Sequence, residues 1–323
     1  MKRKTKSIII GTAAAVTTAA ALIGAYYASA KRLIGIALDR KEPQVTERSR
    51  ARLSGFSDLD TILKTAGDSA EALKKTACET VEITSPDGTR LVGHWYCPEN
   101  PKRAIVAMHG WRSKWYRDFG MISAFWHSND CAVLYAEQRG QGESGGDYMG
   151  FGLLERYDCL KWVGWVSERT EGKIPIYLGG VSMGATTILM TAGFTLPSAV
   201  HGIIADCGFT SPHAIWQHVA KNNLRIPYGL YKNLASDMCK RKIQEGPSDY
   251  SCIDAMKACQ VPVLFIHGTD DRFVPIEMTY ENYKACASPK RLFIVPGAQH
   301  GLSYYVDRDG YETAVKSFWR EYD

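Results

Sequence analysis

The sequence predicts an α/β fold in which helices cover both faces of a mostly parallel central sheet. The first observation is a hairpin pattern, since residues 80–84 and 90–97 are β-rich and flank the turn-forming run Pro86-Asp87-Gly88. The second is that six short apolar runs then alternate with helical stretches, which is typical of βαβ units. The third is that most of these runs end in polar, glycine-rich segments. In a parallel sheet such segments share one edge, and ligands bind there.

The apolar runs are the predicted strands that follow the hairpin. They are near-continuously hydrophobic, as expected for strands that are covered on both faces. Their residues are 104–108, 132–135, 174–178, 202–205, 261–266 and 291–295. The predicted helices are residues 115–128, 153–168, 185–194, 278–287 and 310–322. This alternation places residues 79–323 in one α/β domain.

Residues 1–30 are predicted to be a membrane anchor or a signal peptide. Residues 7–30 carry no charge and follow a basic start, Lys2, Arg3, Lys4 and Lys6. The uncharged run exceeds the roughly 20 residues that a helix needs to cross a bilayer, which favours a retained transmembrane helix. The run Ala28-Ser29-Ala30 also fits a signal-peptidase site, and cleavage after Ala30 would give a secreted protein. Basic residues flank both ends, and we expect an extracytoplasmic body because short N-terminal anchors resemble signal sequences.

Residues 31–78 form the predicted connector between this segment and the domain, and apolar residues recur in it at helical spacing over 59–73. Setting aside the four basic residues before position 7 leaves 35 basic residues against 34 acidic ones. A body so evenly charged argues against nucleic-acid binding. The nine cysteines are scattered and include no Cys-x-x-Cys pair, so neither a disulfide framework nor a zinc site is predicted.

The segment Gly180-Val181-Ser182-Met183-Gly184 lies between a predicted strand and a predicted helix. A serine in a G-x-S-x-G turn at this place has its hydroxyl exposed on a strained elbow, and small neighbours allow the turn to close. Because a serine hydroxyl is a poor nucleophile at its normal pKa, it needs a base to take its proton. Ser182 is therefore the candidate nucleophile, and an ordinary glycine turn is the alternative.

His300 is the candidate base, since it lies in a glycine-flanked loop after the last predicted strand. His109 follows an earlier strand and is interpreted as structural. The acid that orients such a histidine has three candidates when the residues alone are considered. Asp270 and Asp271 follow the strand at 261–266, and Asp206 follows the strand before it.

Five motifs in this order resemble the α/β-hydrolase superfamily. They are His109-Gly110, the run from Arg139 to Gly145, the G-x-S-x-G at 180–184, the run from His267 to Pro275, and Gln299-His300-Gly301. The similarity extends from about residue 80 to the C-terminus. It is strongest to the serine hydrolases, among them bacterial membrane-anchored esterases, monoacylglycerol-lipase-like enzymes and serine aminopeptidase-like members.

The resemblance implies a role for each matched residue. It makes Ser182 the nucleophile, His300 the base and Asp271 the acid, because the family acid is usually the fifth residue of the H-G-x-x-D segment. It also implies that the backbone N–H groups of Trp111 and Met183 form the oxyanion hole. No metal or organic cofactor is implied.

Two loop positions depart from the family pattern, since Glu137 stands where aspartate is common and Gln141 where histidine is common. Both are expected to support loops. The superfamily also commonly carries a small helical cap, which we place at residues 210–253. Within 213–246 its basic residues outnumber the acidic ones and are Lys221, Arg225, Lys232, Lys240, Arg241 and Lys242. One hypothesis is that the cap faces an anionic membrane or an acidic substrate, and a solvated helical face is the alternative.

The predicted function is hydrolysis of a carboxylic ester through an acyl-enzyme intermediate, on a small acyl ester or a peptide-like substrate. Peptidase, aminopeptidase and thioesterase activity use the same residue types and stay open as alternatives. A catalytically silent, membrane-tethered binding protein is the alternative from another class. Nothing in the sequence indicates an oligomeric state. Candidates for an acyl pocket are Trp111, Trp115, Tyr116 and Phe119, with core packing as the alternative for the last three.

Overall fold

An eight-stranded sheet forms the centre of the computed structural model, which describes residues 21–41 and 59–323. The strand order is β1-β2-β4-β3-β5-β6-β7-β8. The strands are β1 (Glu79–Thr84), β2 (Arg90–Tyr96), β3 (Arg103–Met108), β4 (Cys131–Ala136), β5 (Ile176–Val181), β6 (Val200–Asp206), β7 (Val263–Gly268) and β8 (Lys290–Val295). β2 pairs antiparallel with β1 and β4, and the remaining pairs are parallel. The predicted mostly parallel sheet is therefore confirmed.

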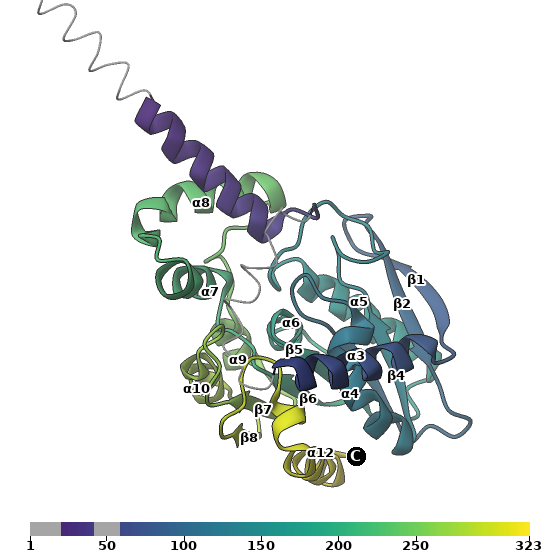
Figure 1. Cartoon of the computed structure of the whole chain (residues 1–323). Helices are drawn as coiled ribbons and strands as arrows, with labels where there is room; N and C mark the ends of the chain where they lie inside the picture. The colour runs from purple at the N-terminus through teal and green to yellow at the C-terminus, as the bar shows by residue number, and fades with distance from the viewer. Residues whose placement is uncertain (1–20, 42–58) are drawn as a thin grey trace, which may run out of the picture.

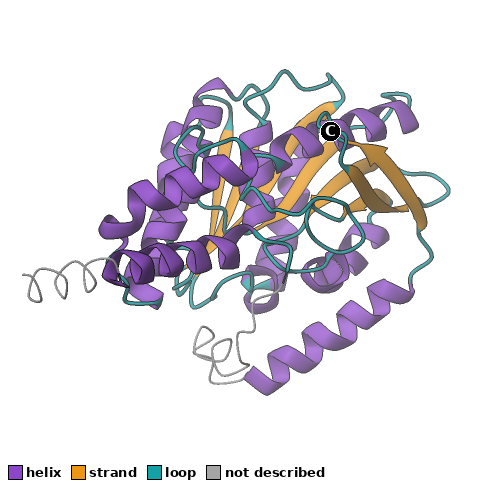
Figure 2. Ribbon diagram, turned by 90° about the horizontal axis from the view of Figure 1, so that it is seen from above, coloured by secondary structure: helices purple, strands orange, loops and turns teal. Residues whose placement is uncertain are grey.

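Helices cover both faces of the sheet (Figures 1 and 2). They are α3 (Leu59–Lys75), α4 (Trp115–Ser128), α5 (Glu155–Arg169), α6 (Met183–Thr191), α7 (Pro212–His218), α8 (Tyr228–Ile243), α9 (Cys252–Ala258), α10 (Ile276–Ala285), α11 (Ser303–Val306) and α12 (Arg308–Tyr322). Successive strand residues point to opposite faces. Accordingly Ile105 of β3 is buried with α4 and α12 on one face, and Val106 is buried with α5 and α6 on the other.

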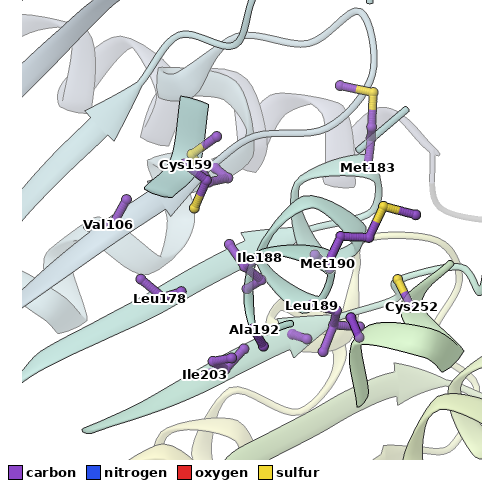
Figure 3. Packing of buried hydrophobic residues seen from close by; sticks show 14 of the residues in the cluster. Val106, Cys159, Leu178, Met183, Ile188, Leu189, Met190, Ala192, Ile203 and Cys252 are labelled. Atoms are coloured by element: carbon purple, nitrogen blue, oxygen red, sulfur yellow. The ribbon is translucent and has the colours of Figure 1, made fainter. Parts of the chain in front are cut away.

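Helix α6 is buried along its whole length between the sheet and the neighbouring helices. Figure 3 shows Ile188 and Leu189 of α6 close to Leu178 of β5 and Ile203 of β6. Such a helix cannot shift without opening the core. Because its first residue directly follows Ser182, this packing fixes the position of the candidate nucleophile.

Two predicted strands differ from the structure. The strand predicted at 174–178 runs on through Val181, so that Gly179 and Gly180 belong to β5. The absence of a side chain suits this crowded position, since a Cβ on Gly179 would lie 3.3 Å from Ile105 Cγ2. The strand predicted at 291–295 is not covered on both faces, because β8 is the sheet edge, pairs only with β7 and is largely half-exposed.

A helix covers residues 21–38 before the domain, and its last turns pack against the body. Ala30, Ile34 and Leu38 on this helix are buried, whereas Leu22 and Ile23 are exposed. Within residues 21–41 and 59–323, no helix is both long and apolar enough to cross a bilayer. Most of the predicted membrane segment falls at positions before 21, outside the described residues, and it stays a prediction.

The segment between β6 and β7 contains α7, the short π-helix Val219–Asn223, α8 and α9. The cap predicted at 210–253 covers the first three of these elements. Figure 1 shows α8 beside the helix of residues 21–38. There the ring of Tyr26 stacks on that of Tyr231 with centroids 5.0 Å apart. The N-terminal helix and the cap are therefore in contact.

Replacing Gly184 by alanine is expected to lower the free energy of unfolding by about 3 kcal/mol or more, as measured by urea denaturation. The reason is that a Cβ there would lie 1.8 Å from the carbonyl oxygen of Met108, a backbone atom that cannot move aside as a flexible side chain could. The matched control is Gly164→Ala within α5, where a Cβ meets nothing within 4 Å. That change should stabilise the helix by up to about 1 kcal/mol. Wild-type stability of the Gly184→Ala variant would contradict the close packing.

Candidate active site

Ser182 occupies the sharp turn between β5 and α6, with φ 57° and ψ −119°. This left-handed conformation is strained for a residue with a side chain. It persists because both flanking glycines are packed tightly. A Cβ on Gly180 would lie 2.6 Å from the backbone of Gly184. The turn is therefore the elbow that the G-x-S-x-G pattern predicts.

The side chains of Ser182, His300 and Asp271 form one hydrogen-bonded chain. His300 Nε2 lies 2.9 Å from Ser182 Oγ, and His300 Nδ1 lies 2.7 Å from Asp271 Oδ2. The other carboxylate oxygen of Asp271 accepts the backbone N–H groups of Phe273 and Val274, each at 2.9 Å. The structure thus brings together the three residues predicted as nucleophile, base and acid.

The electrostatic environment of these three side chains favours an ionised Asp271 beside a basic His300. Burial raises the pKa of Asp271, but His300 and the hydrogen bond from His267 outweigh burial and hold that pKa well below its usual range. Burial lowers the pKa of His300, and the Asp271 carboxylate outweighs it, so that the pKa is raised. An anion that orients a basic imidazole next to a serine is the arrangement that general-base catalysis requires.

The other two acid candidates have different partners. Asp270 is exposed and its carboxylate accepts the hydroxyl of Thr269 at 2.8 Å. Asp206 is buried, and its carboxylate accepts the hydroxyl of Ser303 at 3.0 Å. Burial raises the pKa of Asp206 to about 6. Neither carboxylate has a hydrogen bond to His300 within the described part of the chain.

The loop after β3, residues 109–113, lies against the candidate nucleophile. A Cβ on Gly110 would be 3.5 Å from the Cβ of Ser182. The loop is tied to the body by Asp118, whose carboxylate accepts the backbone N–H of Gly110 at 2.6 Å, and by the side-chain amide of Gln138, which donates to the carbonyl of His109. We call residues 109–113 the oxyanion loop, since it carries Trp111.

The second predicted oxyanion donor is the N–H of Met183, the first residue of α6. N–H groups in the first turn of a helix have no acceptor within that helix, and they form the positive end of the helix dipole. This N–H is therefore available to a ligand at the same edge of the sheet.

Two supporting residues are absent from the predicted set. His267 Nε2 lies 3.1 Å from Asp271 Oδ2, and its Nδ1 lies 2.7 Å from the hydroxyl of Thr279 on α10. Asp118 is a second such residue. No local pattern identifies either, because both contacts depend on how separate helices pack. The one available signal is that His267 precedes Asp271 by four positions at the end of a strand.

The two departures from the family pattern serve the neighbouring loops differently. Glu137 accepts the backbone N–H of Glu143 and lies 3.0 Å from His94 Nε2, so it supports a loop as predicted. Gln141 is buried, and its side-chain amide has no partner within the described residues. His109 accepts the backbone N–H of Gln138 at 3.2 Å, which agrees with a structural role.

Aromatic rings gather next to the oxyanion loop. Phe151 lies 5.9 Å from the ring of Trp111, 5.5 Å from that of Trp216 and 6.0 Å from that of Phe209. These rings form an apolar cluster beside Trp111. Of the other three pocket candidates, Trp115 and Phe119 are buried around Tyr135 in the core, and the half-buried Tyr116 packs against that cluster. Phe119 also lines a small cavity together with Gly180 and Gly301.

Cys207, Asp271 and His300 place one sulfur, one oxygen and one nitrogen within 4.8 Å of one another. Metal binding there would need a thiolate. Burial raises the pKa of the Cys207 thiol well above its ordinary value, and Asp271 and His300 are already bonded to each other. The residues fit a proton-transfer chain better than a metal site.

Comparison with known proteins agrees with this fold. The family described as "Serine aminopeptidase, S33" matches residues 99–244. The uncharacterized protein YqkD of Bacillus subtilis is 27% identical over 251 residues, which cover 78% of this chain and 81% of YqkD. The uncharacterized protein YfhR of Escherichia coli K12 is 28% identical over 250 residues, with 72% and 77% covered.

Among solved structures, the Pyrococcus furiosus esterase Pf2001 superposes with a TM-score of 0.61 at 22% identity, covering 76% of this chain and 93% of the esterase. Acetyl xylan esterase 1 of Thermoanaerobacterium gives a TM-score of 0.57 at 18% identity, covering 87% and 99%. The acylaminoacyl peptidase of Pyrococcus horikoshii gives 0.55 at 18%, covering 77% of this chain and 42% of the peptidase.

The structure has the α/β-hydrolase fold, which agrees with the resemblance to the α/β-hydrolase superfamily drawn from the motifs. Within that superfamily, the part of the chain that matches the S33 serine aminopeptidase family contains Trp111, Ser182 and Met183.

Replacing Asp206 by asparagine is expected to stabilise the protein at pH 8 and to have little effect below pH 4. Burial favours the protonated carboxyl, so the wild type loses stability as the pH rises through about 6. The difference in the free energy of unfolding should approach about 3 kcal/mol at pH 8. Denaturation of both proteins across this pH range measures it. Asp237→Asn, at an exposed carboxylate, is the control. An Asp206→Asn effect independent of pH would contradict the assignment.

Proposed function

We propose that the protein is a serine hydrolase that cleaves carboxylic esters through an acyl-enzyme intermediate. The observation that carries the proposal is the unbroken hydrogen-bond chain from Ser182 through His300 to Asp271, at a strained elbow on the edge of the sheet where ligands bind. Strained backbone conformations are found mainly at functional sites, and a strained turn that exposes a serine hydroxyl is typical of a nucleophile.

The reaction follows from the positions of these groups. Ser182 Oγ attacks the ester carbonyl carbon while its proton passes to His300 Nε2. Negative charge then develops on the carbonyl oxygen, and the N–H groups of Trp111 and Met183 stabilise it. When the C–O bond breaks, His300 returns the proton to the leaving alcohol. Water repeats the sequence and releases the acid, while Asp271 holds the imidazole in one orientation.

The apolar rings around Phe151 support an acyl chain as the group next to the nucleophile. Two of the structural neighbours are esterases, and one is an acylaminoacyl peptidase. Peptidase and thioesterase activity therefore stay as alternatives that use the same groups. A silent binding protein is disfavoured, because it would have no need of a complete proton-transfer chain.

A fluorophosphonate probe is expected to label the wild-type protein covalently and to leave Ser182→Ala unlabelled. The probe reacts only with a serine whose proton is taken by a base. The control is Ser236→Ala, at a serine of α8 away from the elbow. Failure of the wild type to label, or equal labelling of Ser182→Ala, would refute the proposal that the protein is a serine hydrolase with Ser182 as its nucleophile.

The same preparation separates the alternatives when it is tested on p-nitrophenyl esters of graded chain length, on aminoacyl-nitroanilides and on acyl thioesters. We expect the highest kcat/KM on short-to-medium acyl esters. A clear preference for the anilides would assign a peptidase instead.

We also propose that the N-terminal segment anchors the protein in a membrane with the body outside the cytoplasm. Leu22 and Ile23 of the 21–38 helix are exposed, and so is Leu230 of the cap. Tyr26, about one helical turn after Leu22 and Ile23, donates its hydroxyl to the backbone carbonyl of Leu230. Exposed apolar groups close together are typical of a membrane-contacting surface. Ala30 is buried in the middle of the helix, which supports retention of the segment over cleavage after Ala30.

Basic residues of the cap also support membrane contact. Lys221, Arg225 and Lys232 are exposed, and none of them forms an ion pair with any residue that the structure describes. Such charges favour contact with anionic lipid headgroups by about 1 kcal/mol each.

Full-length protein is expected to stay in the membrane pellet after an alkaline carbonate wash. A C-terminal alkaline phosphatase fusion should be active, because that reporter folds only where disulfides form. The matched control is the same fusion to β-galactosidase, which should be inactive. Release by carbonate would contradict anchoring, and the opposite pattern of reporters would place the body in the cytoplasm.

A further inference from the structure

Residues 30–40, here called the docking segment, comprise the last turns of the 21–38 helix and the two residues after it. Ala30, Ile34 and Leu38 are spaced four residues apart and so lie on one face of the helix. All three are buried in the same apolar cluster as Met183. The segment is therefore packed into the body of the protein.

The end of this helix is capped by the oxyanion loop. The last carbonyl groups of a helix lack donors within the helix. Trp111 Nε1 donates to the carbonyl of Ala37 at 2.9 Å, and the Arg112 guanidinium donates to those of Ile36 at 3.0 Å and Asp39 at 2.5 Å. The helix dipole also favours a cation there. Any displacement of the helix would consequently pull on the loop.

The loop is thus held from two sides. Its inner residue Gly110 is bonded to Asp118, which belongs to the body. Its next two residues carry the side chains that reach the docking segment. The backbone N–H of Trp111, one of the two oxyanion donors, lies between these two sets of bonds. Its direction depends on both.

The docking segment is fixed on its far side as well. Lys242 of the cap lies 2.6 Å from the carboxylate of Asp39, and Arg40 donates to the carbonyl of Gly142 at 2.8 Å. The backbone N–H of Met149 donates to the carbonyl of Leu38 at 2.7 Å. Bonds to the cap and to the loop after β4 therefore hold the segment in register with the oxyanion loop.

We propose that the docking segment is a working part of the oxyanion hole, and that the side chains of Trp111 and Arg112 are positioning groups that aim the Trp111 backbone N–H at the substrate carbonyl. This inference rests on the function proposed above and extends it to a part of the chain before the α/β domain. An oxyanion donor acts only within about 2.7–3.1 Å of the oxyanion, so a small displacement of the loop lowers the rate.

The decisive variant is Trp111→Phe, which keeps an aromatic ring beside Phe151 but removes the donor to Ala37. We expect kcat on a p-nitrophenyl ester to fall roughly 10- to 100-fold, a large part of the value of one oxyanion donor. KM should change less than about 3-fold, because ground-state binding does not use that donor. Thermal unfolding of the same samples reports whether the fold is kept.

Trp319→Phe is the matched control, since Trp319 is buried and its indole N–H has no acceptor within residues 21–41 and 59–323. It should leave kcat unchanged. Ile34→Ala loosens the segment without touching the loop, and kcat should fall here too, by a smaller factor.

If Trp111→Phe does not fold, the inference is tested by comparing kcat of two Arg112 variants. Arg112→Lys keeps a cation at the end of the helix and should retain more of kcat than Arg112→Met at equal KM. Wild-type kcat in Trp111→Phe, an equal loss in Trp319→Phe, or no difference between the two Arg112 variants would overturn the inference. An inactive wild type would instead refute the proposed function, and with it this extension.

Discussion

The close approach of α6 to the end of β3 is the constraint on which the site depends. Gly184 lies so near β3 that a Cβ there would be 1.8 Å from the Met108 carbonyl oxygen. Because β3 leads straight into the oxyanion loop, the same approach sets Gly110 against Ser182. One contact between two rigid elements therefore positions both the nucleophile and the loop that faces it. Sites built in this way keep their geometry within a fraction of an ångström.

Two buried carboxylates at this edge show how neighbouring donors decide which one carries charge. Two histidines and two backbone N–H groups surround Asp271, and its pKa is lowered despite burial. Asp206 accepts the hydroxyl of Ser303 and has no histidine as a hydrogen-bond partner among the described residues, and burial raises its pKa to about 6. Below about pH 6 Asp271 is therefore ionised while Asp206 keeps its proton, so that the negative charge lies where it can orient His300. Environments that push pKa values apart in this manner are typical of catalytic sites.

Much of the fold could be predicted from sequence because strand–helix alternation and glycine-rich strand ends are local patterns. Ser182, His300 and Asp271 follow such strands, and the structure brings them within hydrogen-bonding distance. The contacts of Asp118, His267 and the docking segment could not be predicted, since each joins elements whose relative placement no local pattern encodes. The end of β5 was misplaced because Gly179 and Gly180 look like a turn, yet their small size serves close packing inside a strand.

The helix of residues 21–38 is held near both ends, by the stacking of Tyr26 on Tyr231 and by the bonds of Ala37 and Asp39 to the oxyanion loop. A helix that is held at two places keeps a fixed orientation relative to the body, whereas a flexible linker would let the body rotate. If the residues before it are embedded in a bilayer, the edge of the sheet that carries Ser182 is held at a constant angle to the membrane and a constant distance from it. Substrates would then be selected by the depth at which their ester bond lies, as well as by their shape.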